Sequence, residues 1–309
     1  MNKTPGIKIV TGKMKKAILL SVLIISGTLL SAETVYVKST YELIKALENN
    51  KHIVIESGTY NITFNDTLKN VSAHFVKTSG TWENTEITGL QNVTFEGKGK
   101  VSIIITDPYA WVINFTECKN LTFKNIEFGH KVEGECMGGA ALFQDSQNIK
   151  MSEVGLYGCG TTGLELRNVK GFEMDSSKVY KCTYYLTNFS NSENVRISNS
   201  TFENSGIFEM FSFDDNKNVK FENCLIQNNT QKENHYRPIN FIDIISADQP
   251  IEFNKCVFSN NRYSQFSDSL NSLILDDCTF RSNTFDSDEL LKKTKFEKKE
   301  DSQYFIIAE

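Results

Sequence analysis

Short segments of alternating apolar and polar residues recur along most of this 309-residue chain. In each segment the first and third residues after a common starting position are apolar, and the second and fourth are polar nearly throughout. Successive starting positions are separated by 28, 28, 23, 23, 24, 32 and 22 residues. The starting positions are Asn92, Asn120, Asn148, Gly171, Asn194, Asn218, Pro250 and Ser272. This alternation predicts a strand in each segment, with apolar side chains inward and polar side chains outward.

Other residue types recur at fixed distances from the same starting positions. Apolar residues lie eight positions later, at Phe128, Leu156, Val179, Phe202, Ile226, Phe258 and Phe280. Asparagine and serine lie ten and eleven positions later, at Asn204/Ser205, Asn228/Asn229, Asn260/Asn261 and Ser282/Asn283. Cysteines lie six positions later, at Cys224, Cys256 and Cys278. We therefore expect a solenoid of coils about 4.8 Å apart, in which equivalent side chains touch and amides form columns. The motifs of leucine-rich and hexapeptide repeats are absent.

The asparagine-led strand starts and asparagine turns, over roughly 92–285, resemble the right-handed parallel β-helix family, the pectate-lyase-like superfold. The resemblance implies an all-β solenoid of about ten coils. The segment VYVKSTYELIKALENNKHIVIESGTYNIT is similar to the usual opening of such proteins and predicts strand, short helix and strand. Ser39 to Glu42 form a capping box for that helix. Its apolar residues Leu43, Ile44 and Leu47 are expected to cover the open end of the solenoid.

The two ends of the chain differ from the repeats in composition. Three lysines precede an apolar run of 14 residues, Ala17 to Leu30, and small residues follow it. This pattern predicts a secretory signal peptide at 1–32 and an extracytoplasmic location (secreted, periplasmic or cell surface). An uncleaved anchor is the alternative, although a membrane span needs about 20 residues. We expect an N-terminal cap with the first coils at 33–91, coils at 92–285, and at 286–309 either a charged cap of helix and strand or a loose tail.

Charge and cysteine content narrow the classes of partner. The formal charge is −5, and residues 1–32 contain five lysines and no acids, so the mature chain carries −5 − 5 = −10. Such a chain is not expected to bind nucleic acid, and it repels acidic polymers unless a metal ion or a local basic patch intervenes. None of the seven cysteines forms a C-x-x-C pair, which excludes common zinc and redox motifs. Cys159 and Cys182 share a column, where either a disulfide or apolar packing is expected.

The stretch GCGTTG, Gly158 to Gly163, matches the G-x-G-x-x-G pattern of dinucleotide-binding loops. Such a loop leaves a strand and opens a helix whose N-terminus meets the pyrophosphate. Here the following residues, LELRNV, alternate like a strand. We therefore expect turn glycines that permit positive φ, and no dinucleotide cofactor.

The resemblance places candidate sites on the outer face of the strand that precedes each starting position. The inward residues there are Phe115, Phe143, Leu166, Phe189 and Phe213. The outward residues include Glu165, Arg167, Asn188, Ser190, Asp214 and Asp243. Long inserts at 129–139 and 231–238 flank this face, and the second contains Tyr236 and Arg237.

The resemblance also suggests catalytic roles. A family lyase would use Arg167 as the base, and Asp214 with Asp243 could hold calcium. A glycosidase would need two carboxylates at a defined spacing, and Glu165 with Asp214, or Asp214 with Asp243, are the candidate pairs. However, the lyase motifs and the paired-Asp and Gly-His-Gly patterns of polygalacturonases are not found. Polar residues must in any case cover a solenoid, so Glu165 and Arg167 can equally form an ordinary surface pair.

The leading hypothesis is a secreted or surface-associated protein that binds extracellular polysaccharide along this outer ladder. Asn188, Ser190, Tyr236 and Arg237 are the expected contacts. The alternatives are a lyase or hydrolase acting on an acidic polysaccharide, and an adhesin or structural spacer. Sugar binding predicts exposed aromatic rings, for which the candidates are Tyr109, Trp111, Tyr184 and Tyr236. The histidines His52, His74 and His130 are expected to be solvated or packed, and no cofactor besides calcium is expected.

Overall fold

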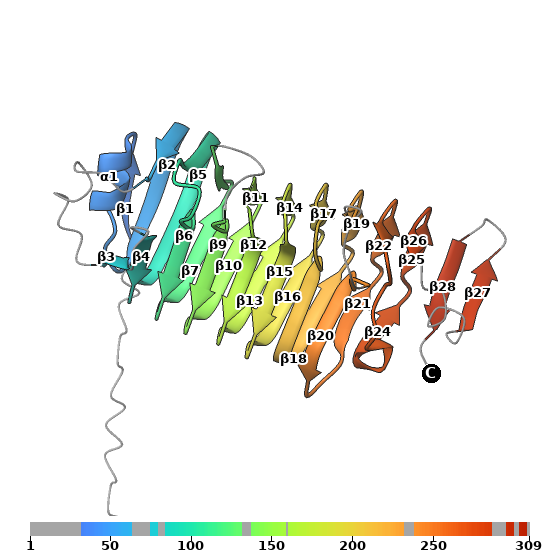
Figure 1. Cartoon of the computed structure of the whole chain (residues 1–309). Helices are drawn as coiled ribbons and strands as arrows, with labels where there is room; N and C mark the ends of the chain where they lie inside the picture. The colour runs from blue at the N-terminus through green and yellow to red at the C-terminus, as the bar shows by residue number, and fades with distance from the viewer. Residues whose placement is uncertain are drawn as a thin grey trace, which may run out of the picture. The chain divides into compact units, whose positions relative to one another are not determined.

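The computed structural model describes residues 32–63, 75–79, 84–131, 137–158, 160–231, 238–285, 295–299 and 303–307. Residues from Ala32 onward form one compact unit. In this unit parallel strands wind into a right-handed solenoid of about eight turns (Figure 1). This is slightly fewer than the ten coils expected, since the N-terminal segment supplies β1, α1 and β2 instead of a complete coil of three strands.

The parallel strands form two sheets, A and B. Each complete turn supplies one strand to sheet B and then two successive strands to sheet A. These two strands stack on their equivalents in the neighbouring turns, and we call the two stacks the first and second ladders of sheet A. Sheet B consists of β3 (Val76–Ser79), β4 (Asn84–Thr88), β6 (Ile113–Thr116), β9 (Ala141–Gln144), β12 (Thr162–Arg167), β15 (Tyr185–Ser190), the start of β18 (Phe211–Glu222) and β20 (Ile242–Ala247). Its strands are parallel, apart from the antiparallel pair β3 and β4. From β4 onward, each sheet B strand leads directly into the first ladder.

The first ladder contains β1 (Glu33–Val37), β2 (Lys51–Asn61), β5 (Gln91–Ile105), β7 (Lys119–Lys124), β10 (Gln147–Ser152), β13 (Lys170–Asp175), β16 (Glu193–Ser198), the end of β18, β21 (Ile251–Asn254) and β24 (Leu273–Asp276). The second ladder contains the ends of β2 and β5, then β8 (Glu127–His130), β11 (Gly155–Tyr157), β14 (Lys178–Tyr180), β17 (Thr201–Glu203), β19 (Leu225–Gln227), β22 (Val257–Ser259) and β25 (Thr279–Arg281). Strands β23 (Arg262–Tyr263) and β26 (Thr284–Phe285) pair separately, and a 3₁₀ turn η1 covers Leu270–Ser272.

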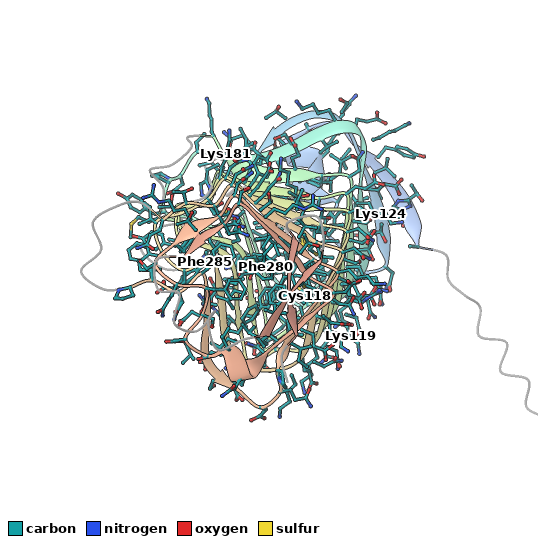
Figure 2. All side chains as sticks on the ribbon, turned by 90° about the vertical axis from the view of Figure 1, so that its right-hand side faces the viewer. Cys118, Lys119, Lys124, Lys181, Phe280 and Phe285 are labelled. Carbon is teal, nitrogen blue, oxygen red and sulfur yellow. The ribbon has the colours of Figure 1, made fainter. Side chains whose placement is uncertain are left out.

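The expected register is confirmed. Val195 pairs with Val219 in the next turn and with Phe172 in the preceding turn. Inward aromatic rings stack along the axis; the centroids of Phe221 and Phe253 are 4.6 Å apart with an interplanar angle of 11°. Viewed from the C-terminal end, apolar side chains fill the interior, while lysines such as Lys119 project outside (Figure 2).

The turns are held by columns of amide side chains. Six of the eight starting positions adopt positive φ, and five of these six are asparagines, which tolerate it better than most residues. Asn120 donates to Asn92 at 2.7 Å, and Asn148 donates to Asn120 at 3.0 Å. The amide column expected after the second ladder is confirmed, because Asn229 donates to Asn261 and Asn261 donates to Asn283, both at 3.0 Å. These bonds lock each turn to the next.

The expected N-terminal cap is present. Helix α1 (Thr40–Lys45) follows β1, and the Ser39 hydroxyl accepts a hydrogen bond from the Glu42 backbone N–H. The reciprocal bond differs from a standard capping box, since the Glu42 carboxylate accepts from Lys38 N–H rather than from Ser39. Leu43 and Leu47 are buried in the solenoid core, so the helix covers the apolar end of the first turns.

At the other end the chain changes from parallel to antiparallel pairing. Strands β27 (Lys295–Lys299) and β28 (Gln303–Ile307) pair antiparallel, and Tyr304 of β28 lies opposite Phe280 of β25. The described part of this end is therefore a strand pair beside the last coil, where a helix with a strand, or a loose tail, was expected.

The glycines of the GCGTTG stretch act in two different ways. Gly158 has φ of +63° and forms a turn, as expected. Gly163 is instead a strand residue of β12, where a Cβ atom would collide with the Val179 side chain and the Leu186 carbonyl. It is needed for close packing rather than for positive φ. No helix follows the stretch, which agrees with the absence of a dinucleotide loop.

The cysteine column lies in the core. Cys224, Cys256 and Cys278 are buried. The contact with Cys224 lowers the pKa of Cys256, but the contact with Cys278 and burial raise it, to about 12 overall. These thiols are apolar core residues, as expected. Cys159, half of the possible disulfide, lies outside the described residues.

Candidate functional site

Sheet B brings the predicted outward residues together on one face. Two columns of side chains run along it, which we call the inner and outer columns of the sheet B face. The inner column is Asn114, Leu142, Glu165, Asn188, Ser212 and Asp243. The outer column is Thr116, Gln144, Arg167, Ser190, Asp214 and Ser246. All six candidates that the structure describes therefore lie on one surface.

Glu165 is more deeply buried than a residue of an ordinary surface ion pair. It is only 5% exposed, whereas the Arg167 side chain is 47% exposed. The Arg167 guanidinium donates from Nε, and from a second nitrogen, to one Glu165 oxygen. The carboxylate thereby gains a charged partner that compensates its burial. The pair is a fixed feature of the face, and the contact occupies two nitrogens of the Arg167 guanidinium.

Neutral hydrogen-bonding groups occupy the middle of the face. Asn188 pairs in register with Glu165 on one side and with Ser212 on the other. Ser190 lies between Arg167 and Asp214 in the outer column. Asn188 and Ser190 are half-buried, so their polar atoms remain accessible from outside. Hydroxyl and amide groups of this kind can hydrogen-bond to sugar hydroxyls.

The two aspartates lie at the C-terminal part of the face, beside an irregularity in β18. The register shifts at Asp214, which pairs with Ser246 and accepts a hydrogen bond from its hydroxyl at 2.7 Å. Asp243 accepts from the Asn240 side chain at 3.0 Å. One turn and two residues separate Asp214 from Asp243, or about 8 Å between backbone positions. Two turns and two residues separate Glu165 from Asp214, or about 12 Å, so the structure does not bring that pair together.

Aromatic side chains border the face where the long connections enter sheet B. Tyr184, directly before β15, stacks on Phe208 of the next turn with centroids 4.4 Å apart and rings 7° from parallel. The Trp111 indole lies across Gly139, where a Cβ atom would collide with it. Tyr109, in the same connection as Trp111, is 47% exposed. We call Trp111, Tyr184 and Phe208 the aromatic border. Tyr236 and Arg237 lie outside the described residues.

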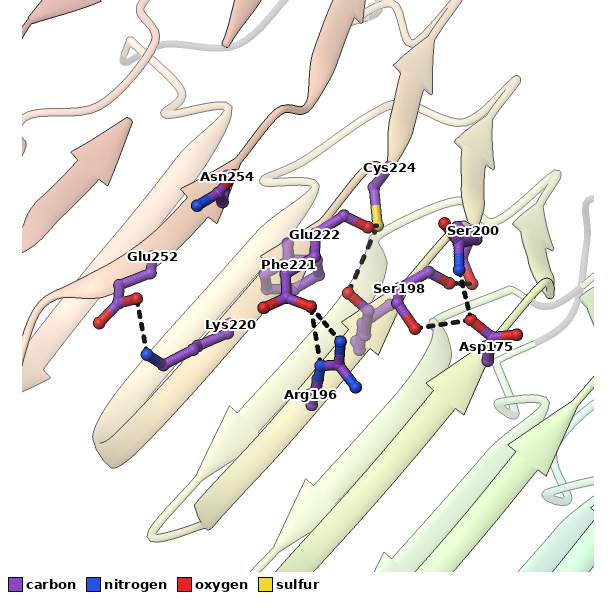
Figure 3. A network of polar contacts seen from close by, with 12 residues as sticks. Asp175, Arg196, Ser198, Ser200, Lys220, Phe221, Glu222, Cys224, Glu252 and Asn254 are labelled. Carbon is purple, nitrogen blue, oxygen red and sulfur yellow. Dashed lines mark hydrogen bonds and ion pairs between the residues drawn. The ribbon is translucent and has the colours of Figure 1, made fainter. Parts of the chain in front are cut away.

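The outer face of the first ladder has a different character. Its charges are matched in ion pairs between neighbouring turns. Lys150 pairs with Glu173 at 2.9 Å. Figure 3 shows two further pairs, Arg196–Glu222 at 2.7 Å and Lys220–Glu252 at 2.9 Å. Asp175 accepts hydrogen bonds from Ser198, Ser176 and Asn199. These bonds lower the pKa of Asp175, and the bond from Ser198 contributes most. Because these charges are mutually neutralised, this face is a poorer candidate for ligand binding than sheet B.

A depression of about 550 Å³ on the second ladder was not anticipated from the sequence. Gly155 and Tyr180 are among its lining residues, and the Glu127 side chain packs against Gly155. Tyr157 stacks on Tyr180 at 5.4 Å, and the Lys178 ammonium lies 4.6 Å from the centre of the same ring while pairing with Glu203. Neighbouring side chains thus already cover the Tyr180 ring, which leaves little aromatic surface for a sugar.

Neither a metal-binding cluster nor a histidine adds a functional group to the described part of the sheet B face. Within the described residues, no group of three or more His, Cys, Asp or Glu side chains is placed to hold a metal ion. His52 contacts Glu96 at 2.8 Å, and His130 is buried with Nε2 3.0 Å from the Ala110 carbonyl. Burial lowers the pKa of His130, so it is packed in its neutral form. His74 lies outside the described residues.

Comparison with known proteins agrees with the fold. Residues 75–237 and 111–285 match the family described as the right handed beta helix region. Together these matches span more than half of the chain, and the protein belongs to this family. A comparison with curated proteins found no match. No helix in the described part of the chain has the length and hydrophobicity needed to cross a bilayer.

Several solved structures are similar to this chain at low sequence identity. A pectate lyase from Paenibacillus sp. 0602 has a TM-score of 0.55 and 11% identity, covering 82% of this chain and 78% of that chain. The pectate lyase Pel9A has a TM-score of 0.50 and 10% identity, covering 82% and 77%. The ORF18 protein of Geobacillus virus E2 has a TM-score of 0.44 and 13% identity, covering 80% of this chain and 57% of its own length. At these identities the likeness concerns the fold.

Proposed function

We propose that this protein binds an extracellular polysaccharide along the sheet B face, as a secreted or surface-associated module. The observation that carries the proposal is the combination of accessible amide and hydroxyl groups on this face with the aromatic border beside it. Sugar rings present an apolar face and a polar rim, so their binding sites pair aromatic stacking with hydrogen bonds. The polar side chains of the outer column, from Thr116 to Ser246, are half-buried or exposed in successive turns about 4.8 Å apart, which gives an extended ligand repeated contacts.

Aromatic truncation tests the proposal. Replacing Tyr184 by alanine removes a half-buried ring of the aromatic border and is expected to weaken polysaccharide binding about 3- to 10-fold, the range for loss of one stacking contact. Binding is measured by affinity electrophoresis over a panel of neutral, amine-bearing and acidic polysaccharides. Tyr157→Ala is the matched control, because Tyr157 is also half-buried and stacked on an aromatic ring but lies on the second ladder. No binding to any polymer, or an equal loss in both variants, would refute the proposal.

A glycoside hydrolase is the second candidate, favoured by one observation. The backbone positions of Asp214 and Asp243 are about 8 Å apart, which allows their carboxyl groups to reach the separation of about 6.5–9.5 Å found in inverting enzymes. The electrostatic surroundings of the two differ little, since each accepts a hydrogen bond from a neutral side chain. Release of reducing ends from a bound polymer, abolished by Asp214→Asn, would establish this alternative.

A further inference from the structure

The strands of the sheet B face carry more acidic than basic side chains. In β6, β9, β12, β15, the start of β18 and β20, the described outward charges are Glu165, Asp214 and Asp243 against Arg167, or 1 − 3 = −2. The single cation is already bonded to Glu165. Asp214 and Asp243 accept only neutral hydrogen-bond donors and form no ion pair with any described residue. The net negative charge of this face is therefore not compensated within it.

Acids occupy three of five successive turn positions along the edge where sheet B turns into the first ladder, and Asn168 and Asn191 occupy the other two. Glu117, Asp145 and Asp215 occupy equivalent turn positions with positive φ, and all three are exposed. Lysines of the first ladder lie beyond this edge, but Lys170 is paired with Glu193 at 3.5 Å and Lys217 with Asp248 at 3.1 Å. Lys119, two residues after Glu117, is exposed and is the remaining basic residue at this edge in the described chain.

A polyuronate laid along this face would place a carboxylate on every sugar beside these acids. Like charges at such distances repel, and exposed charges are screened only beyond about 8 Å at physiological ionic strength. Recognition of a sugar carboxylate also favours a guanidinium with free donor positions. Arg167 directs two of its nitrogens to Glu165 instead.

We infer that the sheet B face takes a glycan without carboxylates, and that it binds amine-bearing sugars more tightly than neutral ones. This inference rests on the proposed function and names its ligand class. Protonated amines of the ligand would lie beside Asp214, Asp243 and the acidic edge, while the aromatic border contacts the sugar rings. Each such exposed charge contact is expected to change affinity about two- to fivefold.

Three hexasaccharides of matched length test this inference. They are oligomers of glucosamine, N-acetylglucosamine and galacturonic acid, which are positive, neutral and negative at mildly acidic pH. Affinity is measured by calorimetry with the full chain, once with a chelator and once with calcium. The expected order is glucosamine tightest and galacturonate weakest, with the difference shrinking as salt is added. Galacturonate binding as tightly as the neutral oligomer, in either condition, would overturn the inference.

Sequence variants distinguish a failure of this inference from a failure of the proposed polysaccharide-binding function. The double change Asp214→Asn and Asp243→Asn is expected to reduce the preference for glucosamine over N-acetylglucosamine while the neutral oligomer still binds. Glu252→Gln, on the outer face of the first ladder, removes an equivalent exposed charge and is expected to leave the preference unchanged. An unchanged preference in the double variant would overturn the inference. Failure of every oligomer and polymer to bind would refute the proposed function itself.

Discussion

Replacing Phe221 by alanine is expected to lower the free energy of unfolding by about 3–5 kcal/mol, the cost of a large cavity in a packed core. Phe221 is fully buried, stacks on Phe253 and meets Phe202, Phe211 and Phe213 edge-on. Its ring therefore joins two successive turns and both sheets. Urea-induced unfolding followed by circular dichroism measures the change.

Ile245→Ala is the control for the Phe221 variant. Ile245 belongs to β20 but is 67% exposed, so its truncation is expected to change stability by no more than about 0.5 kcal/mol. Comparable losses in the two variants would mean that Phe221 is not in a packed core, and the stacked-coil account would fail.

Replacing Asn261 by alanine is expected to cost about 2–4 kcal/mol, because several buried groups lose their partners at once. Its amide donates to the Ile226 carbonyl and to Asn283, and its oxygen accepts from the backbone and the side chain of Asn229. No water can replace these bonds cheaply, since Asn261 is 1% exposed. Thermal unfolding monitored by calorimetry measures the loss.

Asn254→Ala is the matched control for the amide column. Asn254 makes one exposed hydrogen bond to Asp276 at 3.0 Å on the outer face of the first ladder. Its removal is expected to change stability by less than about 1 kcal/mol. If Asn254 proved as important as Asn261, the amide column would not be the element that ties the turns together.

The repeat register was predictable because periodic features reinforce one another. The apolar alternation, the asparagine pairs and the cysteine column each specify the same offset, and Val195 opposite Val219 confirms it. The turn chemistry was only partly predictable. Gly163 was expected to be a turn residue, yet its role depends on the Val179 side chain of β14, on the opposite side of the solenoid, which no local pattern reveals.

The candidate site was predictable as a surface but not in its detail. Outward positions follow from period two, so Asn188, Ser190 and Asp243 lie where the alternation places them. The depth of Glu165 and the register shift at Asp214 depend on tertiary packing around sheet B. The stacking of Tyr184 on Phe208 joins two connections of different length, so a repeat with a fixed period could not predict it.

Hydrogen–deuterium exchange with and without the tightest-binding glycan tests the central claim most directly, that the sheet B face is the binding surface. The account predicts slower exchange in the connections and turns that border β12, β15 and β18, around Tyr184 and Asp215. Exchange in the second-ladder strands β14 and β17 should not change. Protection centred on the second ladder, with none at the borders of sheet B, would contradict it.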